Sequence, residues 1–141
     1  MKTSARNTFR FTITEIIEGA VNAEVSMDLT GDQKLVAIIT NRSVKTLDLA
    51  PGKEVFALVK STFVILTPED GLAKTSARNR LCGSVTMRED GAVNSEIVLD
   101  LGGGKTIAAI ITKKSAETLA LQPGDRACAL IKASHIILAV E

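Results

Sequence analysis

The stretch Thr3-Ser4-Ala5-Arg6-Asn7 decides how this chain is organised, because it returns as Thr75-Ser76-Ala77-Arg78-Asn79, 72 positions later. The offset does not drift along the chain. About 29 of the 64 residue pairs between 3–66 and 75–138 are identical, and Ser, Arg, Asn, Thr and Lys are among them. A core tolerates swaps of similar volume, so shared packing alone would not keep small polar residues identical. The repeat therefore indicates two units with a shared task.

The repeat predicts a first domain at 1–67, a connector at 68–74 and a second domain at 75–141. A unit of about 65 residues buries little surface by itself and is marginally stable. We therefore expect extensive contacts between the copies and between chains. The connector is short, which favours units that pack together over units that swing freely.

The composition argues against several classes of partner. The net charge is +1, and the chain has four Phe but no Tyr or Trp, which is poor material for stacking bases. An OB-type nucleic-acid binder therefore remains only as an alternative. No apolar run approaches the length of a membrane span, and the N-terminus lacks the apolar stretch of a signal peptide. We expect a cytoplasmic protein with no membrane or nucleic-acid partner.

Hydrophobic periodicity predicts a mainly β fold. Alternation indicates strands at 9–17 and at 21–29. In the second of these, every other residue from Val21 to Leu29 is apolar and is expected on one face. Turns at Thr30-Gly31-Asp32 and Gly102-Gly103-Gly104 predict hairpins. The remaining elements of the first copy are a strand at 34–39, a helix at about 42–48, and strands at 54–59 and 63–66. This order predicts two tandem OB-like five-stranded Greek-key barrels, each with one short helix.

The reactive side chains do not suggest catalysis. Cys82 and Cys128 stand where the first copy has Arg10 and Phe56, so we expect two ordinary reduced thiols. The only histidine, His135, also lies in the second copy. A cation site or a Ser-His-Asp triad would then be missing from the first copy. We predict neither an enzyme nor a metal-cation site.

The shared polar residues at element ends are mainly hydrogen-bond donors, a composition that favours anion binding. Thr40 and Ser43 open the helix, where backbone N–H groups are unpaired, and Lys60 adds a point charge. Each feature also has a plainer explanation: the hydroxyls can cap the helix, Lys60 can be a solvated turn lysine, and Arg6 with Asn7 can hold the terminus. Their joint recurrence favours a site for a compact tetrahedral dianion, completed by a neighbouring unit.

The motifs resemble the Mop domain, the molybdenum–pterin-binding or molbindin family. The resemblance rests on Thr-Ser-Ala-Arg-Asn, then Gly-Ala-Val-Asn, then Ile-Thr-x-x-Ser, then Leu-Val/Ile-Lys-Ala/Ser-Ser/Thr, each present twice. Two such units in tandem look like the di-Mop molbindins. The resemblance implies cytoplasmic molybdate (possibly tungstate) storage and homeostasis without an organic cofactor, in a homotrimer with sites between units. A molybdate-sensing module that acts on a separate partner is the alternative.

The resemblance also implies two kinds of oxyanion site. The first kind would use Ser4, Arg6, Asn7, Lys60 and Ser61 with Thr40 and Ser43 of a neighbouring unit, and in the second copy Ser76, Arg78, Asn79, Lys132, Ala133, Thr112 and Ser115. Ala133 replaces Ser61 there, so one hydroxyl is missing. The second kind would use the backbone of Gly19, Ala20, Val21 and Asn22, and of Gly91, Ala92, Val93 and Asn94.

Overall fold

A computed structural model describes residues 1–29, 33–71 and 74–141 of the chain. The first copy forms β1 (Asn7–Glu18), β2 (Asn22–Asp28), β3 (Lys34–Thr40), α1 (Asn41–Thr46), β4 (Glu54–Val59), the 3₁₀ turn η1 (Ser61–Phe63) and β5 (Ile65–Pro68). The second copy forms β6 (Asn79–Asp90), β7 (Asn94–Gly102), β8 (Lys105–Thr112), α2 (Lys113–Leu119), β9 (Arg126–Ile131), η2 (Ala133–His135) and β10 (Ile137–Ala139). The predicted order of three strands, one helix and two strands is confirmed in both copies.

Alternation along the strands sets their buried face. In β1, Phe9, Phe11 and Ile13 are at most 3% exposed, while the residues between them face solvent. In β2, the positions from Ala23 to Met27 alternate as expected. Val21 does not continue this buried face: it is 70% exposed, because it lies in the turn before β2.

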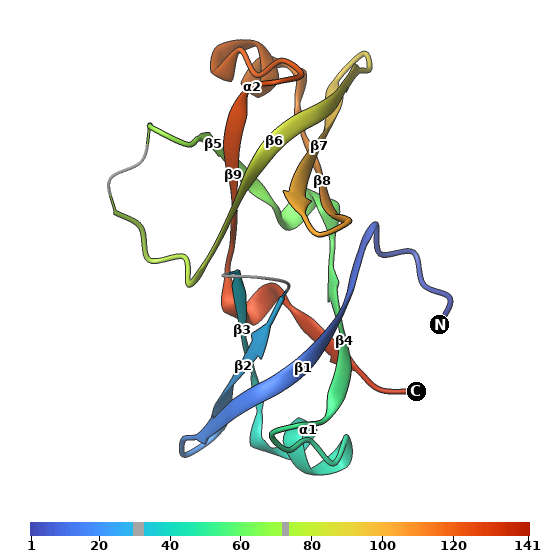
Figure 1. The fold of residues 1–141 in the computed structure, drawn as a ribbon, viewed down its shortest axis with the longest axis vertical. Helices are drawn as coiled ribbons and strands as arrows, with labels where there is room; N and C mark the ends of the chain where they lie inside the picture. The colour runs from blue at the N-terminus through green and yellow to red at the C-terminus, as the bar shows by residue number, and fades with distance from the viewer. Residues whose placement is uncertain (30–32, 72–73) are drawn as a thin grey trace.

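The ten strands form two five-stranded antiparallel sheets whose last strands are exchanged. The first sheet has the order β10-β4-β1-β2-β3, and the second has the order β5-β9-β6-β7-β8. Figure 1 shows β5 beside β9 in one half of the molecule and β10 beside β4 in the other. After β4 and β9, the 3₁₀ turns η1 and η2 carry the chain across to the opposite sheet. Each OB-like unit therefore takes four strands from one copy and the fifth from the other.

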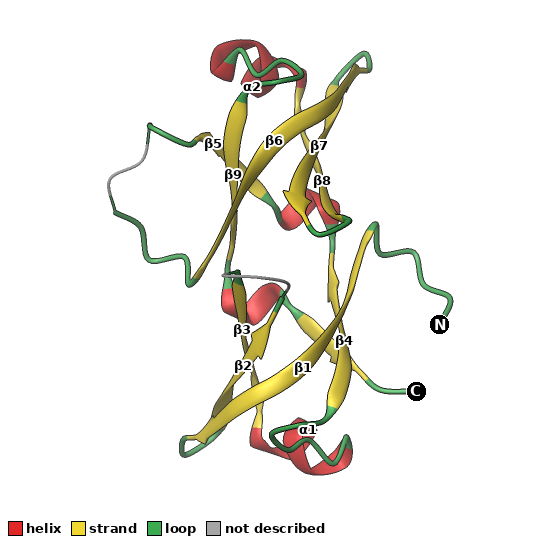
Figure 2. Ribbon diagram, viewed as in Figure 1, coloured by secondary structure: helices red, strands yellow, loops and turns green. Residues whose placement is uncertain are grey.

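This exchange gives the two copies a common hydrophobic core. Val64 and Leu66 of the first copy and Ile136 and Leu138 of the second belong to one cluster with the residues of both sheets. The two sheets lie end to end along the long axis of the molecule, and α1 and α2 lie at its two far ends (Figure 2). The small size of each copy predicts extensive contact between them. The exchanged strands and the shared apolar core provide this contact.

The two predicted hairpin turns have different outcomes. Gly102, Gly103 and Gly104 all have positive φ, at 88°, 61° and 76°, and Gly102 pairs with Lys105 across the turn. Glycine adopts this left-handed backbone without the steric cost that a Cβ brings, so the predicted hairpin is confirmed here. The turn predicted at Thr30-Gly31-Asp32 lies outside the described residues.

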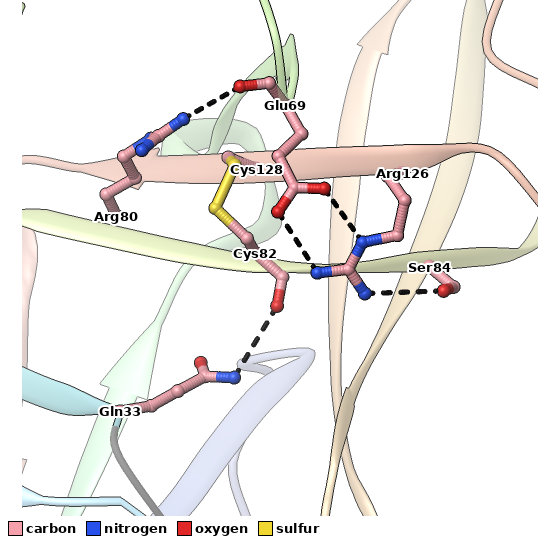
Figure 3. Close-up of polar contacts among 7 residues, drawn as sticks. All are labelled: Gln33, Glu69, Arg80, Cys82, Ser84, Arg126 and Cys128. Atoms are coloured by element: carbon pink, nitrogen blue, oxygen red, sulfur yellow. Dashed lines mark hydrogen bonds and ion pairs between the residues drawn. A yellow bond between two sulfur atoms is a disulfide. The ribbon is translucent and has the colours of Figure 1, made fainter.

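The expectation of two reduced thiols is wrong in this structure, because Cys82 and Cys128 form a disulfide. They face each other on the neighbouring strands β6 and β9, with their Cα atoms 3.9 Å apart. The register of the strands, and not the spacing of 46 residues in the chain, brings them together. Figure 3 shows that the Glu69 carboxylate and Arg126 pair beside this disulfide.

Candidate functional site

Each helix begins with a pair of hydroxyl groups that bind each other. The Thr40 Oγ1 accepts from the Ser43 amide at 3.1 Å and lies 2.9 Å from the Ser43 Oγ. Thr112 and Ser115 repeat this arrangement at 3.1 Å and 2.8 Å. The capping role is therefore present in both copies. Both threonines are exposed residues, so the helix starts lie at the surface.

The Gly-Ala-Val-Asn turns lie against the helix starts. The amide of Gly19 donates to the carbonyl of Asn22 at 2.8 Å, and the amide of Asn41 donates to the carbonyl of Val21 at 2.8 Å. A Cβ at position 19 would lie 3.0 Å from the Asn22 carbonyl oxygen, which explains the glycine there. The structure thus places the turn predicted for the second kind of site next to Thr40.

The electrostatics of this turn differ between the copies. Asp90, just before the second turn, accepts hydrogen bonds from Arg88 and Ser95. These bonds to the ionised carboxylate hold the pKa of Asp90 below its usual value. The first copy has Ile16 and Ala23 at the positions of Arg88 and Ser95, so Glu18 lacks the same partners.

Asn7 and Asn79 bridge the two sheets. The Asn7 side chain donates to the Ala108 carbonyl and accepts from the Ala108 amide, both at 2.8 Å. Asn79 does the same with Val36, at 2.8 and 2.7 Å. A carboxamide that pairs with both backbone groups of an edge residue acts as an extra rung of the sheet. The structure therefore shows these asparagines, both buried, engaged with β8 and β3.

Arg6 and Arg78 also cross between the sheets. Arg6 pairs with Glu96 on β7, and Arg78 pairs with Glu24 on β2. The repeat alone did not mark the two glutamates as site residues. Their partnership with the arginines was missed, although both residue types recur at the constant offset of 72.

The lysine turns lie against the edge strand of the opposite sheet. Lys60 precedes η1, which contacts β8, and Lys132 precedes η2, which contacts β3. Both lysines are exposed, and the Lys60 Nζ lies 5.4 Å from the centre of the Phe63 ring. Ser61 is only 7% exposed, as its counterpart Ala133 is 2% exposed. The exposed hydroxyls of these turns belong instead to Thr62 and Ser134.

Two hollows combine the helix start of one copy with the 3₁₀ turn of the other. The first, of about 650 Å³, brings Thr112 and Ser115 together with Thr62. The second, of about 260 Å³, brings Thr40 and Ser43 together with Ser134. Their remaining lining is mainly apolar and comes from the edge strands, from β5 or β10 and from the helices, and Lys114 of α2 also lines the first hollow. Arg6, Arg78, Lys60 and Lys132 are not among the described residues that line these two hollows.

The arrangement brings donors from both copies to the same edges of the sheets. Asn7, Arg6 and η1 of the first copy meet β7 and β8, and β8 leads into Thr112. The second copy meets β2 and β3 in the same way. Hydroxyls that line a hollow, with a guanidinium group on the neighbouring strand outside it, are donor types that suit a small oxyanion. No helix in the described ranges is long and apolar enough to cross a bilayer.

Comparison with protein-family models finds the TOBE domain twice, at residues 3–66 and 75–138. These ranges coincide with the aligned repeat.

Named relatives support the same relationship. The chain is 54% identical over 140 residues to the molybdenum-pterin-binding protein MopA of Rhodobacter capsulatus, covering 99% of this chain and 53% of that protein. It is 46% identical over 140 residues to the molybdenum transport protein ModE of Azotobacter vinelandii, covering 99% and 52%. The chain therefore spans about half the length of the curated relatives it matches.

Among solved structures, the chain is similar to the cytoplasmic molybdate-binding protein ModG in its form with molybdate bound. The identity is 48%, the TM-score is 0.96, and the match covers 100% of both chains. At this level of identity and coverage, the two chains share the whole fold.

Proposed function

Because the chain belongs to the TOBE domain family, we propose that it binds molybdate, or tungstate, reversibly and serves to store and buffer this oxyanion in the cytoplasm. The function is binding without catalysis. The similarity over its full length to a molybdate-bound protein that is described as cytoplasmic supports this assignment.

One observation carries the proposal: the same set of donors occurs twice, and each set meets the opposite sheet. Arg6 and Asn7 reach the sheet whose edge strand, β8, ends at Thr112. Arg78 and Asn79 reach the sheet whose edge strand, β3, ends at Thr40. A dianion needs several converging donors and at least one cation to replace its hydration. At each edge the guanidinium group comes from one copy and the helix-start hydroxyls come from the other.

The residues proposed for the sites follow the repeat. Each site of the first kind combines the N-terminal segment and lysine turn of one unit with the helix start of another. The first copy contributes Ser4, Arg6, Asn7, Lys60 and Ser61 to one site and Thr40 and Ser43 to another, and the second copy contributes the equivalents Ser76, Arg78, Asn79, Lys132 and Ala133, and Thr112 and Ser115. The second kind uses the backbone of 19–22 and 91–94, beside the helix starts.

We also propose that a homotrimer completes these sites. Ile65, Ile137 and Phe63 are 64%, 63% and 42% exposed, and the first two lie beside the hollows. Exposed apolar side chains next to a half-built polar site fit an interface between subunits. Analytical ultracentrifugation tests the assembly, and a monomer that binds molybdate as tightly as the assembled protein would exclude this part of the proposal.

Isothermal titration with molybdate, tungstate, sulfate and phosphate tests the function. We expect molybdate and tungstate to bind more tightly than sulfate, and phosphate to compete weakly. Equal affinity for sulfate would contradict the proposal. The double variant Lys60→Ala/Lys132→Ala tests the lysines, because it removes two exposed cations without touching the core. It should weaken molybdate binding about tenfold and leave the melting temperature unchanged.

Sensing is the second candidate, because the chain is also similar to ModE proteins, one of which is named a DNA-binding transcriptional dual regulator. In that case the bound oxyanion would change the affinity for a separate partner. Affinity capture from cells, with and without molybdate, separates the two functions. A partner whose recovery depends on molybdate would support sensing, and its absence would support storage.

A further inference from the structure

Two ion pairs hold the arginines that we assign to the oxyanion sites. Arg6 pairs with Glu96, and Arg78 pairs with Glu24, each across the boundary between the sheets. The four residues are two pairs of equivalents in the repeat, so the same contact forms twice in one molecule. Its recurrence ties it to the repeat and not to the chance position of one long side chain.

The backbone at each arginine is anchored, while the paired side chain stays half-exposed. The neighbouring asparagine of each one is buried and bonded to the opposite edge strand, which anchors the main chain there. The side chain of Arg6 is nevertheless 51% exposed, and that of Arg78 is 50% exposed. A half-exposed guanidinium on an anchored backbone can exchange one anion for another by rotating its side chain, without movement of the fold.

The glutamates stand next to the helix-start hydroxyls. In the register of β7 and β8, Glu96 faces Ile110 and Asn94 faces Thr112. Positions two apart on a strand lie on the same face, about 7 Å apart. The Arg6–Glu96 pair therefore lies one such step from Thr112, beside the hollow that Asn94, Ile110 and Thr112 line. Glu24 has the same relation to Thr40, because Glu24 faces Ile38 and Asn22 faces Thr40.

From this geometry we infer that Glu24 and Glu96 are built-in counter-ions that determine the affinity and specificity of the oxyanion sites. In the ligand-free protein each carboxylate neutralises the arginine of the other copy. A tetrahedral dianion binds by taking the guanidinium from the carboxylate and accepting the nearby hydroxyl donors at the same time. This inference rests on the proposed function, since the anion it concerns is the one bound there.

The counter-ion explains how an exposed arginine can discriminate between anions. A carboxylate competes with every incoming anion, including chloride. An anion that offers only charge replaces one surface ion pair with another and gains little. A tetrahedral oxyanion has several acceptor oxygens, so it can take the arginine and the helix-start hydroxyls together. The glutamate thus lowers the affinity of the site for a simple anion such as chloride more than its affinity for a tetrahedral oxyanion.

The test compares Glu24→Gln, Glu96→Gln and the double variant with the unchanged chain, in titrations with molybdate at low and high chloride. Glutamine keeps the size of the side chain and removes its charge. Glu89→Gln is the matched control, because Glu89 is exposed and faces Glu96 from β6. It removes the same charge from the adjacent strand but has no contact with Arg6 among the described ion pairs. Melting temperatures confirm that each variant is folded.

We expect each glutamine variant to bind molybdate about two- to fivefold more tightly, the range set by the strength of an exposed ion pair. Chloride should also compete more strongly in these variants than in the unchanged chain. Glu89→Gln should alter neither property. Unchanged or weaker binding in Glu24→Gln and Glu96→Gln would overturn the inference, as would equal tightening in Glu89→Gln. If the unchanged chain fails to bind molybdate, the proposed function itself is wrong and the inference falls with it.

Discussion

The two sheets come from one repeat, yet they join the same pair of neighbouring strands by different chemistry. In the first sheet, Arg10 on β1 faces Phe56 on β4, with the guanidinium carbon 5.3 Å from the ring centre. In the second sheet, Cys82 and Cys128 occupy those register positions and form a disulfide. One sheet has a weak, exposed contact where the other has a covalent bond at the equivalent place. The repeat therefore preserves the strand topology but not the interaction that links these two strands.

This difference lies directly behind the proposed sites. β6 begins at Asn79, immediately after Arg78, and β9 ends at Ile131, immediately before Lys132. The disulfide therefore clamps the two strands that present the donors of the second copy. The donors of the first copy have no such covalent link: they are held by the strand pairing, by Arg10 over Phe56 and beside Glu54, and by the bonds of Asn7 with Ala108.

The largest expected effect is the loss of the disulfide. Reduction, or the variant Cys82→Ala/Cys128→Ala, should lower the free energy of unfolding by about 2 to 4 kcal/mol, because it removes a cross-link across 46 residues. Urea denaturation with and without dithiothreitol measures the change. Arg10→Ala is the control at the equivalent place and should cost less than about 1 kcal/mol. A chain whose unfolding midpoint ignores dithiothreitol would remove the distinction between the sheets.

The next effect concerns the asparagines that join the sheets. Asn7→Ala leaves the buried amide and carbonyl of Ala108 without their hydrogen-bond partner. It should lower the free energy of unfolding by about 2 to 3 kcal/mol. Asn79→Ala should cost at least as much, because it removes two partly buried bonds with Val36 and also the buried bond that Asn79 donates to the Ile131 carbonyl at 3.2 Å. Chemical denaturation of both variants gives the ranking. A clearly smaller cost for Asn79→Ala would show that the bond to Ile131 does not contribute to stability.

The fold was predictable where the sequence pattern is local. Alternation in β1 and the Thr-x-x-Ser helix starts fixed the type and order of the elements, and the repeat supplied them twice. The exchange of β5 and β10 was not predictable in this way, because alternation indicates which face of a strand is buried and not which sheet edge it joins. The Lys60 turn was recognised, but its direction follows from the 3₁₀ geometry of η1.

The site was predictable as a set of residue types but not as a set of contacts. The constant offset singled out Arg6 and Asn7, yet it did not distinguish a buried bridge from an exposed ligand group, and only Asn7 is buried. The disulfide was missed for a related reason: comparison of the copies treated Cys82 and Cys128 as exceptions to the repeat. Their counterparts Arg10 and Phe56 also face each other, so strand register would have revealed the pair.

A smaller effect should separate the two sites by affinity. Ser61 has Ala133 as its counterpart, so one proposed site has a hydroxyl that the other lacks. We expect titration with molybdate to show two classes of site that differ about fivefold, the value of roughly one hydrogen bond. Ser61→Ala should merge them at the weaker affinity, and Ala133→Ser should merge them at the stronger one. A single affinity in the unchanged chain would mean that the serine hydroxyl, which is buried, does not reach the ligand.

The smallest expected effect is a dependence on acid pH at the turn before β7, which the equivalent turn of the first sheet lacks. The Arg88 guanidinium and the Ser95 hydroxyl hold the pKa of Asp90 below its ordinary value of 3.8. A carboxyl whose pKa is lowered by folding stabilises the protein above that ordinary value, and this contribution is lost as the pH falls through the lowered pKa.

Asp90→Asn should therefore reduce the melting temperature slightly at pH 7 and make progressively less difference below about pH 4. Glu18→Gln at the equivalent position should leave the melting temperature unchanged throughout, because Ile16 and Ala23 cannot form the bonds that Arg88 and Ser95 form. If both variants respond alike, the charge before the Gly-Ala-Val-Asn turn acts through the general field of the protein, and the local network of the second copy has no separate role.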